Sequence, residues 1–111
     1  MRKLLYFIPL LLVLASCGEY TKVLKSHDVD YKFDYAKRAY DQRKYLQAST
    51  ILSEIVTPLR GGPNGEEALF LLAMSYYENK DYPNSAVYFK TYYNRYPKGK
   101  YAELARFYSG Y

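Results

Sequence analysis

The residue with the clearest chemistry is Cys17, the only cysteine in the sequence. It closes the tetrad Leu14-Ala15-Ser16-Cys17, behind two cations and an uncharged run over residues 4–15. Small residues before a sulfur nucleophile are typical of a bacterial lipoprotein processing site. We therefore predict that residues 1–16 are a signal peptide and that the Cys17 sulfur is lipidated. The alternatives are an ordinary secretory peptide with a coincidental cysteine and a membrane-spanning helix, but the apolar run is shorter than the ~20 residues that a span needs.

The residues after the cysteine indicate where such a protein would reside. Bacterial lipoproteins generally carry two or three acyl chains, which makes their attachment effectively permanent. Gly18 follows Cys17 in place of the aspartate that commonly signals inner-membrane retention, and no acidic cluster follows to suggest surface export. We therefore expect an outer-membrane protein that is lipid-anchored on the periplasmic face. Residues 17–28 are interpreted as the lipidated cysteine and a tether.

The charge of the chain excludes one class of partner. The formal charge of +5 loses the two signal cations, Arg2 and Lys3, which leaves +3 on the mature chain. Acidic residues alternate with the remaining cations, and no basic block marks a nucleic-acid site. We expect no nucleic-acid partner.

Enzymatic chemistry finds no support in the sequence. The only histidine, His27, lies in the expected tether, where no nucleophile and base can be assembled around it. Glu66 and Glu67 are expected at the start of a helix, where the positive end of the helix dipole stabilises their carboxylates. No residues have metal-ligand spacing. The stretch from Gly61 to Gly65 is interpreted as a helix connector. We predict no catalytic residues, no metal and no cofactor.

The elements behind the tether are predicted to be helical throughout. Glycines and prolines over residues 57–65 and 96–99 separate them, and Asp81 with Pro83 marks a tighter break with a helix start. The expected helices span residues 30–42, 46–57, 66–79, 83–96 and 100–111.

Two stretches of the sequence resemble each other, which indicates that the expected helices form repeats. Residues 44–48 and 81–85 occupy equivalent places 37 residues apart, close to the ~34-residue period of tetratricopeptide repeats. Residues 66–99 match that pattern fully, whereas residues 30–65 match it less fully through Tyr35, Ala36, Tyr45, Ala48, Leu52 and Ile55. In the fuller unit the matching residues are Leu69, Leu72, Ala73, Tyr76, Ser85, Phe89, Tyr92 and Pro97. We predict an all-α tetratricopeptide-repeat solenoid of about two and a half repeats over residues 29–111. A peptide-binding helix bundle is the alternative fold.

The third unit is predicted to expose an apolar face. Leu104, Phe107 and Tyr111 share one side of the last expected helix, and no second helix follows to cover them. These residues are therefore expected either to dock on another chain or to await a missing helix. Of these readings, we favour a chain truncated in its third repeat.

At this point the chain resembles the BamD family, outer-membrane lipoproteins with tetratricopeptide repeats that belong to the β-barrel assembly machinery. The resemblance rests on the site ending in Cys17, on the first repeat opening at Tyr31–Lys37 (YKFDYAK), and on the turn and restart at Asn94–Ala102 (NRYPKGKYA). It implies a scaffold that assists the insertion of outer-membrane β-barrel proteins. It also implies two partners, the barrel protein BamA and unfolded outer-membrane protein clients. Family members are longer, and their later repeats are the ones implicated in docking BamA.

A candidate client groove follows from helical geometry. The first helix of each repeat lines the concave side, and its inward positions lie between the packing positions. These positions are Phe33, Lys37 and Tyr40 in the first unit and Phe70, Met74 and Tyr77 in the second. Together they make an apolar, adaptable floor with one cation for a peptide carboxylate. The other interpretation is that these side chains pack against the tether or a neighbouring helix.

Other functions use the same repeats differently. A different tetratricopeptide lipoprotein would organise cell-wall or other envelope machinery, and a lipoprotein enzyme is the third class. The 16 tyrosines also suggest an exposed aromatic contact surface for a protein or glycan, although repeat packing accounts for most of them.

Overall fold

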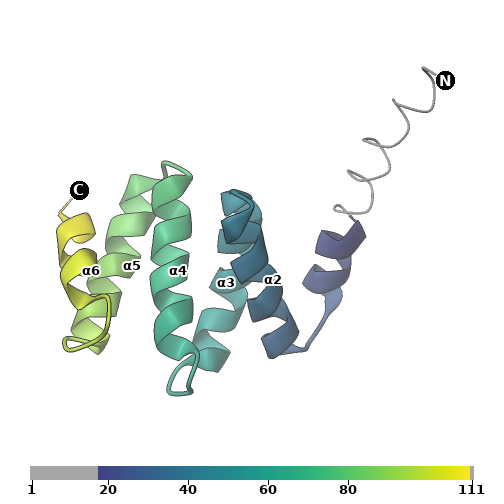
Figure 1. The fold of residues 1–111 in the computed structure, drawn as a ribbon, viewed down its shortest axis with the longest axis horizontal. Helices are drawn as coiled ribbons and strands as arrows, with labels where there is room; N and C mark the ends of the chain where they lie inside the picture. Colours follow the sequence, from purple (N-terminus) through teal and green to yellow (C-terminus); the bar gives the residue numbers. More distant parts are fainter. Residues whose placement is uncertain (1–17, 111) are drawn as a thin grey trace.

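The computed structural model describes residues 18–110, and the regular structure in this range is entirely helical. Helices α2 (Val29–Asp41), α3 (Tyr45–Leu59), α4 (Gly65–Glu78), α5 (Tyr82–Arg95) and α6 (Ala102–Ser109) follow one another in the chain. They stand side by side in a row (Figure 1), and each helix packs on the next. The predicted all-α helical-repeat fold is confirmed.

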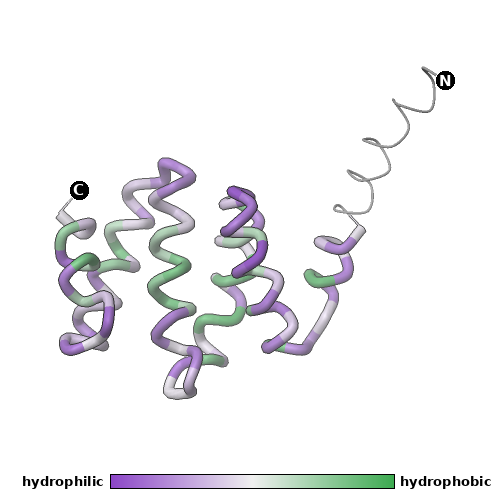
Figure 2. The backbone as a smooth tube through the Cα atoms, viewed as in Figure 1, coloured by the Kyte–Doolittle hydropathy of each residue, from purple (hydrophilic) through white to green (hydrophobic). Residues whose placement is uncertain are grey.

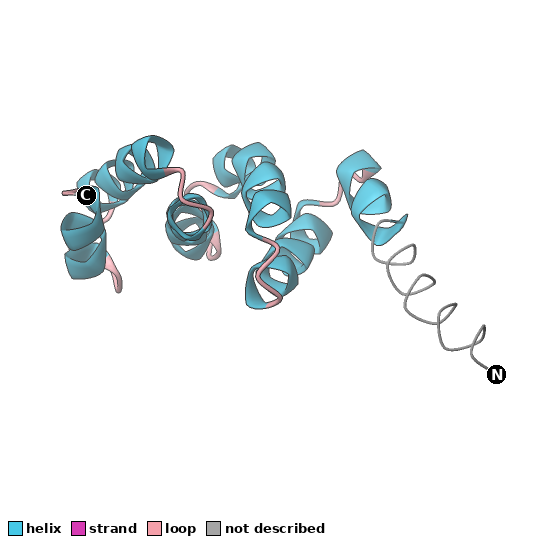
Figure 3. Ribbon diagram, turned by 90° about the horizontal axis from the view of Figure 1, so that it is seen from above, coloured by secondary structure: helices cyan, strands magenta, loops and turns pink. Residues whose placement is uncertain are grey.

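The row consists of helix pairs. The pair α2 and α3 forms the first repeat, the pair α4 and α5 forms the second, and α6 opens a third unit. Helix α3 packs on α4 as closely as the partners within a repeat do, and α2 also touches α4. The view along the helices shows this stacking from one end of the chain to the other (Figure 3). The stacking buries two core clusters, one beneath α2, α3 and α4 and one beneath α4, α5 and α6, and Val56 and Tyr88 pack against both.

The helix boundaries fall within two residues of those predicted from the sequence. Inside the chain, two differences reach two residues: α6 begins at Ala102 where residue 100 was expected, and α3, which was expected to stop before Pro58, continues to Leu59. Pro58 is the second-to-last residue of α3, so its missing N–H donor and the crowding by its ring affect only the last turn of the helix. The helix then ends at a turn in which Gly61 has φ 84°, a left-handed conformation that glycine adopts without strain.

Side-chain caps explain two of the helix starts. Asp28 accepts a hydrogen bond from the backbone N–H of Tyr31 at 3.2 Å and begins α2. Asp81 accepts from the N–H of Asn84 at 3.4 Å and begins α5, with Pro83 in the first turn. Each aspartate satisfies a donor that the first turn leaves without a helical partner.

The turn inside each repeat has the same geometry in both copies. Arg43 and Lys80 both have φ 63°, in the left-handed region. The next N–H then reaches back to the first helix, from Lys44 to the Ala39 carbonyl at 2.8 Å and from Asp81 to the Tyr76 carbonyl at 2.9 Å. This is the hydrogen bonding of a Schellman-type helix end. The 37-residue period seen in the sequence therefore extends to the backbone.

Small residues sit where paired helices approach closely. Ala36, Ala48 and Ala73 are completely buried, and Ser85 is 1% exposed. The Ser85 hydroxyl on α5 donates to the Ala73 carbonyl on α4 at 3.1 Å, which is possible only because the two backbones are close. Colouring by hydropathy shows the apolar stretches of the helices, most clearly on α4 (Figure 2). The predicted close-approach residues are confirmed.

The segment expected to be a tether is different. Residues 18–25 are helical, and we call them the N-terminal segment. Val23 is completely buried in the core of the first repeat, and Tyr20 packs against the same core. The tether prediction is therefore wrong for these residues, because the segment buries two apolar side chains. The predicted signal peptide, Cys17 and Tyr111 lie outside the described residues.

Candidate functional site: the surface of the first helices

The predicted groove residues occupy equivalent places on α2 and α4. Phe33, Lys37 and Tyr40 follow one another at intervals of four and three residues, and Phe70, Met74 and Tyr77 repeat this pattern 37 residues later. These intervals place each set along one side of its helix. The structure therefore confirms the helical placement of the six side chains, while their role in binding stays a prediction.

In the α2 half of the surface, one of the predicted groove side chains is buried and another covers it. Phe33 is only 3% exposed and belongs to the core of the first repeat. The Lys37 ammonium lies 4.6 Å from the centre of the Phe33 ring, a cation–π contact that covers the ring. The expectation that the Phe33 ring lies open on a groove floor is therefore wrong, because core packing takes up the ring. Lys37 itself remains half-buried.

Tyr40 stands at the end of α2 as a neutral hydrogen-bonding group. Its ring meets that of Tyr45 edge to face at 5.3 Å, across the repeat's internal turn. Burial raises the pKa of Tyr40 to about 12 because it disfavours the phenolate, and the nearby Glu78 carboxylate raises it further. The phenol therefore keeps its proton at neutral pH and can both donate and accept a hydrogen bond.

The α4 half is covered by the third unit. The Phe70 ring stacks on Tyr101 with 4.1 Å between centroids and 7° between planes. The Tyr77 ring lies 4.6 Å from that of Tyr108 on α6. Met74 packs beside them as a half-buried side chain. The packing interpretation thus accounts for much of this half, and intermediate exposure remains at Phe70, Met74 and Tyr77.

Sequence reasoning missed Tyr101 and Tyr108 as members of this surface. A signal was present, because the two tyrosines are seven residues apart, as are Phe33 and Tyr40 and also the Phe70 and Tyr77 pair. Each unit therefore supplies an aromatic pair with the same interval. The pair of the third unit packs on the pair of the second, which produces a continuous aromatic cluster.

The linker before α6 is fixed by one carboxylate. Glu66 Oε1 accepts hydrogen bonds from the Tyr92 hydroxyl at 2.7 Å and from the Lys100 backbone N–H at 3.0 Å. The Tyr92 oxygen in turn accepts from the Tyr101 N–H at 3.0 Å. Burial and the bond to Glu66 raise the pKa of Tyr92, so the hydroxyl stays protonated as this bond requires. Glu66, expected only to favour a helix dipole, also positions Tyr101.

The outer side of α6 is apolar and open. Leu104 is 49% exposed and Phe107 is 58% exposed, whereas Ala102 and Ala105 face the neighbouring helix and are buried. The predicted partner-docking or missing-helix face is therefore accessible at these two residues. What covers it stays a prediction.

A metal site needs several ligating side chains close together. In residues 18–110, no three His, Cys, Asp or Glu side chains gather in a way that could hold a metal ion. His27 is exposed between the N-terminal segment and α2. None of the helices in this part of the chain is long and apolar enough to cross a membrane.

The repeats and their surface define a helical-repeat scaffold, and the comparisons identify the family. The model of the YfiO family, described as outer membrane lipoprotein, matches residues 26–111. The chain therefore belongs to this family of outer membrane lipoproteins. Neither the comparison with curated proteins nor the comparison with solved structures gives a match.

Proposed function

We propose that this chain is a lipid-anchored scaffold of the β-barrel assembly machinery, of the BamD type, on the periplasmic face of the outer membrane. The observation that carries the proposal is the family match, which spans both repeats and α6. The tetrad ending in Cys17 supports the lipid anchor. In this role the protein binds the barrel protein BamA and unfolded outer-membrane protein clients, and it catalyses no reaction.

The geometry supports a smaller client surface than the sequence suggested. Lys37, Tyr40, Met74 and Tyr77 keep intermediate exposure along α2 and α4. An extended client strand could place an aromatic side chain against Met74, since thioether contacts with rings are favourable. The Lys37 ammonium could meet a terminal carboxylate, and the Tyr40 phenol could bond a strand backbone. This assignment leaves out Phe33, which is buried.

The outward face of α6 supports protein contact by a second route. Leu104 and Phe107 lie three residues apart on one side of the helix, both about half exposed. Large exposed side chains on one face of a helix are characteristic of helix-to-helix contact in repeat proteins. We propose that this face packs on a further helix of the same scaffold or on a machinery partner.

Co-purification tests the proposal. The lipidated protein is isolated from membranes in mild detergent, and its partners are identified by mass. We expect a large barrel protein with periplasmic domains to be recovered. The control is Lys90→Gln, an exposed substitution on α5 that leaves Leu104 and Phe107 in place and should retain the partner. Consistent recovery of cell-wall enzymes without any barrel protein would instead favour a lipoprotein that organises other envelope machinery.

A client peptide tests the smaller surface. A peptide that ends in an aromatic residue should bind the protein, and Lys37→Gln with Met74→Ala should weaken binding by about tenfold or more, as expected for losing a charge-assisted contact and an apolar one. Lys90→Gln, on the exposed side of α5, is the control. Unchanged affinity in the double variant would remove this surface from the proposal.

A further inference from the structure

The N-terminal segment is docked on the first repeat by apolar contacts. Val23 is completely buried, and the ring of Tyr20 lies 6.2 Å from that of Tyr35 on α2. Both side chains belong to the core of the first repeat or pack against it. The segment therefore covers the open end of the solenoid, as a capping helix does.

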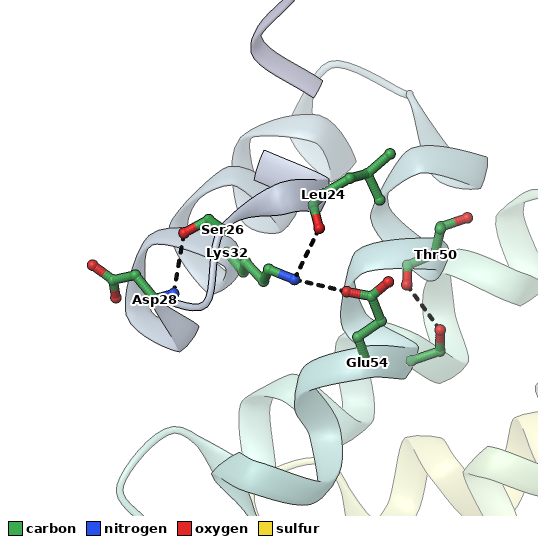
Figure 4. A network of polar contacts seen from close by, with 7 residues as sticks. Leu24, Ser26, Asp28, Lys32, Thr50 and Glu54 are labelled. Atoms are coloured by element: carbon green, nitrogen blue, oxygen red, sulfur yellow. Dashed lines mark hydrogen bonds and ion pairs between the residues drawn. The ribbon is translucent and has the colours of Figure 1, made fainter. Parts of the chain in front are cut away.

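Two cations of α2 strengthen this docking. Arg38 Nη2 pairs with Glu19 Oε1 at 3.1 Å. Lys32, 8% exposed, donates through Nζ to the Leu24 carbonyl at 3.5 Å and to Glu54 Oε2 on α3 at 2.8 Å (Figure 4). One ammonium thus ties the segment to α3 across α2. These contacts hold the segment at both of its ends.

The opposite side of the segment is basic. Successive helical residues turn by about 100°, so Lys22 and Lys25 lie on a common side, away from the buried Val23. Both lysines are exposed. The single acid of the segment, Glu19, is paired with Arg38. The outward face therefore carries two positive charges and no negative charge.

This basic face follows the anchoring residue directly in the sequence. Gly18, the first described residue, is adjacent to Cys17. We propose that the N-terminal segment is a mount, which caps the first repeat and places Lys22 and Lys25 on anionic phospholipid headgroups, so that the solenoid stands in one orientation on the membrane. The inference rests on the lipid anchor of the proposed function. A flexible tether would give the anchor without fixing any orientation.

The two lysine charges set the expected effect on the equilibrium between oriented and unoriented protein. A lysine close to an anionic membrane surface contributes about five- to sixfold to the equilibrium constant, so two contribute about thirtyfold. Salt screens charges over about 8 Å at physiological ionic strength, so the contact should weaken as salt rises. The docking of Val23 inside the protein should not share this salt dependence.

The test measures the orientation of the lipidated, full-length protein on vesicles. Lipid occupies Cys17, so Asn94→Cys on α5 supplies a single site for a donor dye, with acceptor dyes in the bilayer. Vesicles of phosphatidylcholine are compared with vesicles that also contain phosphatidylglycerol. We expect one narrow donor-to-bilayer distance on the anionic vesicles and a broad range on the neutral ones.

Charge variants distinguish a specific contact of Lys22 and Lys25 with the membrane from a general attraction between a basic protein and anionic lipid. Lys22→Gln with Lys25→Gln should lower the ratio of oriented to unoriented protein by about thirtyfold and give broad distances on both vesicles. Lys90→Gln with Lys98→Gln removes the same charge from exposed positions near the other end and should keep the narrow distance. Both pairs change only exposed side chains, and unchanged helicity confirms that they fold.

Three outcomes would contradict the proposal that the N-terminal segment orients the solenoid on the membrane. They are equal distance distributions on the two vesicle types, a narrow distance retained by the Lys22/Lys25 variant, and an orientation that appears only when a protein partner is added. The failure of the proposed function looks different. If the intact mass shows no lipid, both the proposed function and the orienting role of the segment are contradicted. If the lipidated protein recovers the barrel protein but its orientation does not depend on phosphatidylglycerol, only the orienting role is contradicted.

Discussion

A short helix packs at each end of the two described repeats, and the two helices are held by different interactions. The N-terminal segment docks on α2 through the buried Val23, the exposed Arg38–Glu19 ion pair and a 3.5 Å hydrogen bond from Lys32 Nζ to the Leu24 carbonyl. Helix α6 docks on α4 and α5 chiefly through rings, with Tyr101 against Phe70 and Tyr108 against Phe89 at 5.1 Å.

The two junctions should respond differently to salt. Exposed or half-exposed ion pairs contribute about 1 kcal/mol or less and weaken with salt. Buried aromatic pairs contribute through apolar area, which salt does not screen. We therefore expect the α6 junction to share the stability of the whole solenoid and the N-terminal junction to open on its own.

The largest expected effect lies in the aromatic junction. Phe89 is completely buried and contacts the rings of Phe70, Tyr77 and Tyr108. Phe89→Ala should lower the free energy of unfolding by about 3–5 kcal/mol, because it removes apolar area and leaves a cavity. Urea unfolding followed by circular dichroism measures this loss. Phe107→Ala, at a 58% exposed position, should change it far less, and equal losses would contradict the packing described.

The next effect tests the linker into α6. A Cβ on Gly99 would collide with the Glu66 carboxylate and lie 2.7 Å from the Tyr92 hydroxyl oxygen. Gly99→Ala should therefore cost about 1–3 kcal/mol, as overpacked sites do. Gly110→Ala is the control, since its nearest contact would be an ordinary 3.5 Å. If thermal unfolding places both variants at the same midpoint, the Glu66 network does not hold the linker.

A substitution in the N-terminal junction should lower stability by a smaller amount, and only in that part of the protein. Val23→Ala removes two buried methyl groups, or about 1.5 kcal/mol at roughly 0.8 kcal/mol for each. Amides of residues 18–25 should then exchange hydrogen faster, while those of α4 keep their protection. Lys22→Ala, on an exposed residue of the same segment, serves for comparison. A matching loss of protection in α4 would show that the two junctions unfold together.

The Lys32–Glu54 ion pair, which joins α2 to α3 beside this junction, should contribute less still. The Lys32 side chain is 11% exposed and that of Glu54 is 45% exposed, so solvent screens the pair from one side. A double-mutant cycle with Lys32→Met and Glu54→Gln should give a coupling energy of about 1 kcal/mol or less, which declines as salt is added. A salt-independent coupling would mean that the pair is effectively buried.

The smallest effect has the opposite sign. Lys80 adopts φ 63°, where an L-residue is strained by about 1–2 kcal/mol and glycine is not. Lys80→Gly should stabilise the protein by about 0.5 kcal/mol, because the greater backbone entropy of unfolded glycine offsets part of the gain. Lys98→Gly, at a position without positive φ, should destabilise it instead.

The sequence was sufficient for the helices because their signals are local. Asp81 and Pro83 mark the start of α5, and the repeat period fixes which side of each helix is buried. The N-terminal segment escaped prediction because eight residues with one buried valine show no helical period. The Lys32–Glu54 pair joins residues 22 apart, and such distant pairing is settled only by the packing of helices. For the same reason Phe33, placed on the groove by spacing, proved to be core.

Depletion of the protein from its own cells is the most direct test of the proposed role in β-barrel assembly. Outer-membrane fractions are compared before and after depletion, with an unrelated lipoprotein measured as the control. The account predicts that β-barrel proteins decline in the outer membrane while the control lipoprotein stays at its level. Unchanged levels of folded β-barrel proteins after complete depletion would contradict it.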